Sequence, residues 1–159
     1  MPEPRRSTIR QRFADAHVRL AQTPLLAMLE DPTTFTDGDL QSVGLDYFAL
    51  GIPCPFLEDE SCSIYPERPI ACREYLVTSP AAFCARPSAE TIRMVPIPGQ
   101  ASNAVSRIDE TPDARFIPWV PLILAPEWSR SNPEGAPTLM APELLRRFFS
   151  RLAEPARSD

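Results

Sequence analysis

The chain is organised around the segment Cys54-Pro-Phe-Leu-Glu-Asp-Glu-Ser-Cys62-Ser-Ile-Tyr65-Pro-Glu-Arg68-Pro-Ile-Ala-Cys72-Arg73-Glu-Tyr75. A fourth cysteine, Cys84, follows it, so all 4 cysteines of the 159-residue chain lie between positions 54 and 84. Four thiols gathered in one short window indicate a shared purpose. We expect them to be metal ligands, held together by the helices on either side.

The cysteines follow the spacing C-x7-C-x9-C-x11-C, which is wider than the C-x2-C of common zinc sites. Wide spacing carries a small penalty, because lengthening a chelate loop from 3 to 9 residues costs roughly 1 kcal/mol of loop-closure entropy. Structural Zn²⁺ binding contributes about 10–16 kcal/mol in small peptides. The pattern therefore permits a metal site, while two disulfides in any of three connectivities, or buried free thiols, remain the alternative interpretations.

Side chains beside the cysteines fit a thiolate site. Arg68 and Arg73 lie close in sequence to Cys72, where their charges would favour thiolates and offset the negative charge of a four-thiolate centre. We expect these two arginines, with Tyr65, to surround the ligands. Five carboxylates add negative charge nearby; they are Glu58, Asp59, Glu60, Glu67 and Glu74. We expect the trio 58–60 to lie in a solvated loop, with ligation to a harder iron centre as the alternative.

Composition narrows the class of protein. Hydrophobic residues make up 43% of the chain, which is typical of a globular protein, and 20 prolines with only 5 glycines predict short helices joined by stiff connections. A net charge of −5 argues against a general nucleic-acid binder. Lysine is absent, which excludes Schiff-base lysine chemistry, and the single histidine, His17, makes a Cys-His or Ser-His dyad improbable.

No run of about 18 apolar residues is present, so the sequence predicts no membrane span. The start of the chain contains the pair Arg5-Arg6 but no apolar region behind it, which argues against a secretory or twin-arginine signal. We therefore expect a cytoplasmic, reducing location, where clustered cysteines are more often ligands than disulfides.

Hydrophobic spacing predicts a mainly α fold: a small irregular helical domain with a proline-rich, metal-stapled central loop region and at most a short strand pair. One domain spans 1–159, with a helical part over 5–50, the cysteine segment over 54–84 and packing helices over 100–153. The predicted helices are Ser7–Ala21, Pro24–Leu29, Thr36–Leu50, 100–108, a broken helix over Pro118–Ser129, and Ala141–Ala153. Thr91–Val95 is the predicted strand, Ser7 and Thr23 are the expected N-caps, and Gly51 is expected to end the third helix.

Two surfaces outside the cysteine segment are candidate contacts. The first predicted helix has a basic face formed by Arg5, Arg6, Arg10, Arg12 and Arg19. We expect this face to be solvated, with a contact to a partner or to an acidic lipid surface as the alternative. We expect the Trp119–Trp128 segment to be buried, with an exposed docking patch as the alternative.

The residues of the cysteine segment resemble a known family. The pattern Cys54-x-Phe56-Leu57, then Cys62-x-Ile64-Tyr65-x-x-Arg68-Pro69-x-x-Cys72-Arg73, then Cys84, is similar to the bacterial cysteine-cluster family of zinc- or iron-chelating domains (YkgJ-type), some of which are labelled iron–sulfur oxidoreductase-like. Family members typically carry a further C-x-x-C-C-like group upstream, whereas this chain has no cysteine before Cys54. Either those ligands are absent or the chain begins downstream of them. Four cysteines suffice for one tetrahedral Zn²⁺ or one iron–sulfur cluster.

The sequence thus predicts a metal-binding protein in which Cys54, Cys62, Cys72 and Cys84 ligate zinc or iron, with the metal mainly structural. One alternative is an iron–sulfur redox protein or electron carrier, although no nucleotide, flavin or haem motif is present to exchange electrons with it. The other is an interaction module with an unknown protein partner. The sequence assigns no catalytic residue and leaves open whether the chain is an enzyme.

Overall fold

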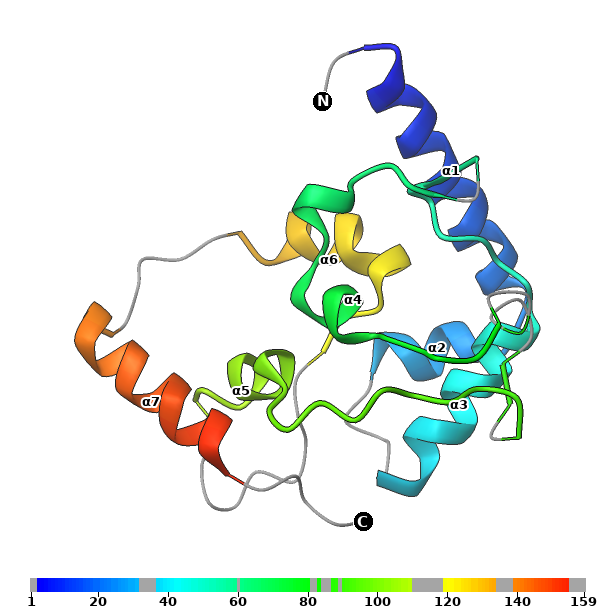
Figure 1. Cartoon of the computed structure of the whole chain (residues 1–159). Helices are drawn as coiled ribbons and strands as arrows, with labels where there is room; N and C mark the ends of the chain where they lie inside the picture. Colours follow the sequence, from blue (N-terminus) through cyan, green and yellow to red (C-terminus); the bar gives the residue numbers. More distant parts are fainter. Residues whose placement is uncertain are drawn as a thin grey trace.

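The computed structural model describes residues 3–31, 37–59, 61–80, 83, 87–88, 90–109, 119–133 and 139–154. Most of these residues are helical, so the predicted fold class is confirmed (Figure 1). The elements are α1 (Arg5–Ala21), α2 (Leu25–Glu30), α3 (Asp37–Ala49), β1 (Leu57–Glu58), β2 (Ser61–Cys62), η2 (Tyr65–Glu67), α4 (Ile70–Glu74), α5 (Ala101–Ser106), η4 (Leu122–Leu124), α6 (Ala125–Ser131) and α7 (Ala141–Ala153).

The main core joins α1, α2, α3 and η4. Its members share a position on the inward apolar stripe of their elements; they are Ala16, Leu20, Leu25, Leu29, Val43, Ile123 and Leu124. Leu20 is fully buried, with an exposed fraction of 0%. Ile123 and Leu124 lie about a hundred positions after Leu20 in the sequence, so the core brings together segments that are far apart in the chain.

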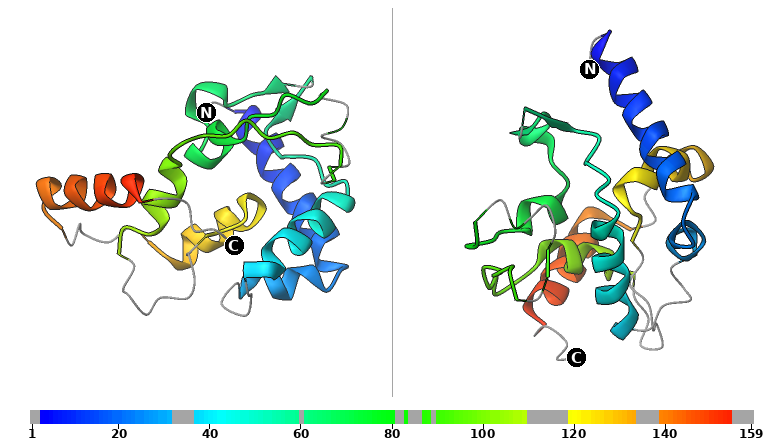
Figure 2. Two further views of the ribbon diagram at one scale, coloured as in Figure 1. Left: turned by 60° about the horizontal axis from the view of Figure 1, so that its bottom comes forward. Right: turned by 90° about the vertical axis from the view of Figure 1, so that its right-hand side faces the viewer.

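A second packing group joins α4, α5 and α7. Glu74, the last residue of α4, accepts hydrogen bonds from the main-chain N–H groups of Ala101 (2.6 Å) and Ser102 (3.2 Å) at the start of α5. A carboxylate satisfies these otherwise unpaired donors at the positive end of the helix. Arg107, just after α5, is buried and forms a 2.8 Å ion pair with Glu154 beyond α7. Figures 1 and 2 show α7 at the edge of the molecule, on the far side of α5 from α1 and α3.

Several predicted boundaries are confirmed. Helix α7 occupies the predicted range Ala141–Ala153, with Pro142 in its first turn. Gly51 has a φ of 58° directly after α3, as expected of a glycine that ends a helix. The segment after Val120 is a broken helix, because Pro121 precedes the η4 turn and Pro126 falls in the first turn of α6.

The two predicted N-caps are wrong. Helix α1 begins at Arg5, two residues before Ser7, because the carboxylate of Glu3 accepts the N–H of Ser7 at 3.2 Å while the Ser7 hydroxyl donates to the Pro4 carbonyl. The Thr23 hydroxyl likewise donates back to the carbonyl of Leu20 (2.8 Å) instead of capping α2. In both cases the hydroxyl serves a main-chain carbonyl, which local hydrogen bonding also allows.

The predicted strand over Thr91–Val95 is also wrong. Met94 forms an isolated antiparallel bridge with Val77, and Thr91 lies in a turn closed by hydrogen bonds to Ser88. Pro96 follows at once and has no N–H to extend the pairing. The regular sheet in the described ranges is the pair β1–β2, with Leu57 opposite Cys62 and Glu58 opposite Ser61.

No helix within the described ranges has the length and apolar character needed to cross a bilayer.

Replacing Leu20 with Ala should lower the free energy of unfolding by about 2–5 kcal/mol, because a fully buried leucine leaves a cavity when it is truncated. Urea denaturation followed by circular dichroism measures this change. Val18→Ala is the matched control on the same helix, since Val18 is 57% exposed. Equal effects of the two substitutions would contradict the packing of α1 described above.

Candidate metal centre

Three arginines of α1 lie seven residues apart, at positions 5, 12 and 19. Seven residues make about two helical turns, so the three side chains share one face of the helix. We call Arg5, Arg12 and Arg19 the arginine clamp. The face they form is directed at the segment 50–63, which carries the first two cysteines.

The arginine clamp binds the main chain of that segment. All of the hydrogen bonds measure between 2.9 and 3.3 Å, and the accepting atoms are the carbonyl oxygens of Leu50 and Gly51 for Arg19, Pro55 and Leu57 for Arg12, and Ser63 for Arg5. The prediction of a solvated basic face is therefore wrong for these three arginines. Their guanidinium groups offer several donors in a fixed plane, which suits adjacent carbonyls.

Glu58 joins two members of the arginine clamp. Its carboxylate oxygens lie 3.3 Å from Arg5 and 3.3 Å from Arg12, and its side chain is 31% exposed. The expectation of a solvated acidic trio is therefore wrong at Glu58. Asp59 has a φ of 47° at the turn between β1 and β2, and Glu60 lies outside the described residues. Both carboxylate oxygens of Glu58 pair with arginines of α1, so this side chain fixes the β1–β2 hairpin to the helix. It is therefore not available to a metal.

An aromatic contact supports the same docking. The rings of Phe13 on α1 and Phe56 meet edge-on, with centroids 5.4 Å apart. Edge-to-face pairs of this kind add to the area that the rings bury. Cys54 therefore lies between two attachments to α1: the Arg19 contacts that precede it and the Phe56 contact that follows.

Cys72 lies on a different element from Cys54 and Cys62. It lies in the short helix α4, and the preceding turn is closed by Arg73, whose guanidinium donates to the carbonyls of Arg68 (2.9 Å) and Pro66. Arg73 thus fixes the main chain between Cys62 and Cys72. Arg68 stacks over the ring of Tyr65, with 3.9 Å between its guanidinium carbon and the ring centroid. Tyr65 itself is 63% exposed.

The three described cysteines share one electrostatic neighbourhood. Cys72 is exposed as a residue, but neighbouring atoms partly shield its thiol from water, and this desolvation is the main reason why its pKa is raised. The negative charges of Cys54 and Cys62 raise the same pKa further, while Arg68 lowers it. Burial first, and then the charge of Cys54, raise the pKa of Tyr47 on α3. Cys54 and Cys62 are therefore near enough to Cys72 for their charges to act on it.

The geometry is open. Cys54 lines a hollow of about 280 Å³ between α1 and the segment 52–57, so solvent reaches it. Within the described ranges no group of three or more His, Cys, Asp or Glu side chains is arranged closely enough to hold a metal ion. Cys84, the fourth predicted ligand, lies outside the described residues. The donor chemistry fits a thiophilic metal, and the described thiols would have to move closer together to form its first three bonds.

Comparison of the chain with protein-family models, with curated proteins and with solved structures finds no match. The resemblance to the cysteine-cluster family therefore depends on the residues of the motif alone.

Replacing Arg12 with Gln should destabilise the protein by about 1 kcal/mol and expose the segment 50–63 to protease, because three acceptors lose a charged donor. Urea denaturation and limited proteolysis with peptide mapping give the two measurements. Arg10→Gln is the control, since Arg10 lies on the same helix with an exposed side chain. Cleavage at the same rate in both variants would count against the arginine clamp.

Alkylation of Cys72 by iodoacetamide should follow a pH–rate profile whose midpoint lies above that of the urea-unfolded chain. The raised pKa leaves less thiolate at any given pH, so the native rate is slower at mildly alkaline pH. Replacing Cys54 and Cys62 with Ser removes two neighbouring charges and should move the midpoint down. Peptide mass spectrometry of chelator-treated protein resolves the rate at Cys72. If the midpoint of the Cys72 profile is the same with and without the two substitutions, the charges of Cys54 and Cys62 do not act on Cys72.

Proposed function

We propose that the chain is a cysteine-cluster metal-binding protein in which Cys54, Cys62, Cys72 and Cys84 hold one Zn²⁺ or iron centre. The observation that carries this proposal is that three free thiols, Cys54, Cys62 and Cys72, come from three separate segments and lie near enough for the first two to raise the pKa of Cys72. Thiolates that repel one another gain when a cation is placed between them, because repulsion is replaced by ligation. The metal would then serve chiefly to link these segments.

The surroundings of the thiols support this role. The arginine clamp holds the main chain on both sides of Cys54 and at Ser63, next to Cys62, while Arg73 holds the turn that leads to Cys72. Preformed segments lose less conformational entropy when ligands converge. Arg68 already lowers the pKa of Cys72, and the same charge would offset that of a thiolate-rich centre. A cytoplasmic location belongs to the proposal, because reducing conditions keep the thiols available.

An iron–sulfur redox protein is the second candidate. Cys54 and Cys72 are both exposed, so a cluster bound there would lie close to the surface, as electron exchange with a partner requires. When bound, the cluster would supply one-electron chemistry. The protein's own contribution would be Arg68, whose positive charge favours the more negative, reduced state of a nearby centre.

Anaerobically purified protein should contain about one metal per chain, and Cys54→Ser or Cys72→Ser should each reduce this stoichiometry several-fold. Elemental analysis gives the metal and its amount. Ser61→Ala is the control, because Ser61 is the exposed neighbour of Cys62 and offers no thiolate. Chelation should also expose residues 54–84 to protease while the core around Leu20 stays folded.

The visible spectrum separates the two candidates. A colourless zinc protein supports the structural role, and a broad absorbance that bleaches on reduction supports the iron–sulfur protein. Protein that carries no metal after anaerobic purification, fails to bind added Zn²⁺ or Fe²⁺, and resists protease equally with and without chelator would rule out both.

A further inference from the structure

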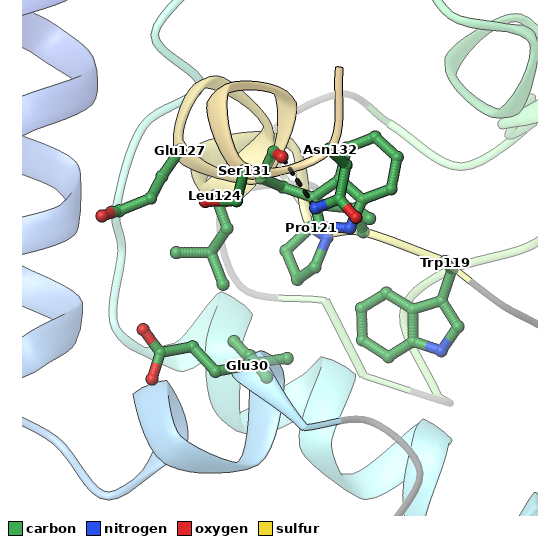
Figure 3. Close-up of a pocket in the computed structure, with 10 residues that line it drawn as sticks. Glu30, Trp119, Pro121, Leu124, Glu127, Ser131 and Asn132 are labelled. Atoms are coloured by element: carbon green, nitrogen blue, oxygen red, sulfur yellow. Dashed lines mark hydrogen bonds between the residues drawn. The ribbon is translucent and has the colours of Figure 1, made fainter. Parts of the chain in front are cut away.

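A second hollow lies between the end of α2 and the η4–α6 segment (Figure 3). Its volume is about 240 Å³. The ten side chains that line it are Leu29, Glu30, Trp119, Val120, Pro121, Leu124, Glu127, Trp128, Ser131 and Asn132. Cys54, Cys62 and Cys72, the predicted metal ligands that the structure describes, are not among them.

Aromatic rings form a large part of its wall. Trp119 and Trp128 are the chain's 2 tryptophans, and both line the hollow. Trp119 packs against the main core, while Trp128 is 51% exposed. The side-chain amide of Asn132 donates to the carbonyl of Trp128 at 2.9 Å and so fixes the end of α6. The predicted burial of the Trp119–Trp128 segment is therefore wrong at Trp128, which lines the hollow and is half exposed.

The described side chains give the hollow a negative charge. Among the described residues, its lining contains two carboxylates, Glu30 and Glu127, and no arginine, lysine or histidine. Figure 3 shows both carboxylates on one side of Leu124, with the Trp119 ring across the hollow. Glu127 lies 3.7 Å from His17 of α1, whereas Glu30 has no hydrogen-bond or ion-pair partner among the described residues. An indole face attracts cations, because the ring quadrupole is negative above its plane.

We propose that this hollow binds an organic cation, an alkylammonium or alkylguanidinium group of about the size of one amino-acid side chain. The cationic head lies between Glu30 and the indole rings, and the alkyl part contacts Pro121 and Leu124. The volume sets the size, because pockets for drug-sized ligands and cofactors measure about 300–1,000 Å³. The cation comes either from a free small molecule or from an arginine or lysine side chain of a partner protein.

Tryptophan fluorescence tests this directly, because both tryptophans of the chain lie in the hollow. Choline and ethylguanidinium should each change the emission in a saturable way that weakens as salt is added. The neutral isostere of choline, 3,3-dimethylbutanol, should bind at least about fivefold more weakly. Equal binding of the neutral isostere, or no change in emission with either cation, would overturn the proposal.

A charge-neutral variant gives the second measurement. Glu30→Gln should weaken the binding of choline and ethylguanidinium about fivefold, and Glu67→Gln, an exposed glutamate of η2, should leave it unchanged. Glu30 is itself exposed, so the variant is expected to fold, and circular dichroism checks this. If Glu30→Gln binds the cations as tightly as the unchanged protein does, Glu30 has no role in binding. An equal loss of affinity in Glu30→Gln and Glu67→Gln would contradict that role as well.

The affinity of a third ligand distinguishes the two sources of the cation. N-acetyl-arginine methylamide carries the same guanidinium as ethylguanidinium together with flanking peptide groups. Binding about tenfold tighter than ethylguanidinium would identify a partner's side chain as the source, because the peptide groups then also make contacts. Binding no tighter than ethylguanidinium would identify a free cation. Both results are consistent with the proposed cation site. The site does not depend on metal binding, so a negative result in the metal experiments above would not contradict it.

Discussion

The contact on which the cysteine segment depends is the one between the arginine clamp and the carbonyl oxygens of residues 50–63. This segment has two strands of two residues each, so it lacks a ladder that could hold its own shape. A peptide of this kind would leave its carbonyls to water and its conformation unfixed. Helix α1 supplies the missing donors at intervals of about two turns, and its length sets the length of the segment that it can hold.

Cys72 reaches the same neighbourhood from the other packing group. Its helix, α4, is joined to α5 through Glu74, and α5 packs on α7. The three described thiols therefore lie where the main core and the second group meet. Any change in how these groups sit against each other alters the distances between thiols, and a metal bound by all of them would oppose that change.

The helices were predictable where proline, glycine and apolar spacing agreed, as in α7 and at Gly51. The start of α1 was not predictable in this way, because the carboxylate of Glu3, and not the hydroxyl of Ser7, accepts a main-chain N–H in the first turn. Alternation over Thr91–Val95 suggested a strand, but Val77 pairs with Met94 alone. Short polar segments can satisfy their hydrogen bonds in several ways, and tertiary contacts decide among them.

The predicted ligand set and its surrounding residues stay a prediction. Cys54 and Cys62 lie near enough to Cys72 to affect its pKa, but no group of three or more candidate ligands among the described residues is arranged to hold a metal ion. The arginine clamp was missed, although its seven-residue spacing is visible in the sequence, because a basic helix face is usually solvated. Which carbonyls such a face binds depends on the path of residues 50–63, which no local pattern specifies.

Recognition through carbonyl oxygens has a consequence for how this segment can vary. The arginine clamp contacts atoms that every residue type possesses, so Leu50, Leu57 or Ser63 could be exchanged for another residue without losing these bonds. Arg5, Arg12 and Arg19 have no such freedom, because each needs a long, charged side chain with several donors. Divergent relatives could thus share the docked conformation of this segment while differing at most positions of its sequence. The spaced arginines and cysteines would be the residues that such relatives retain.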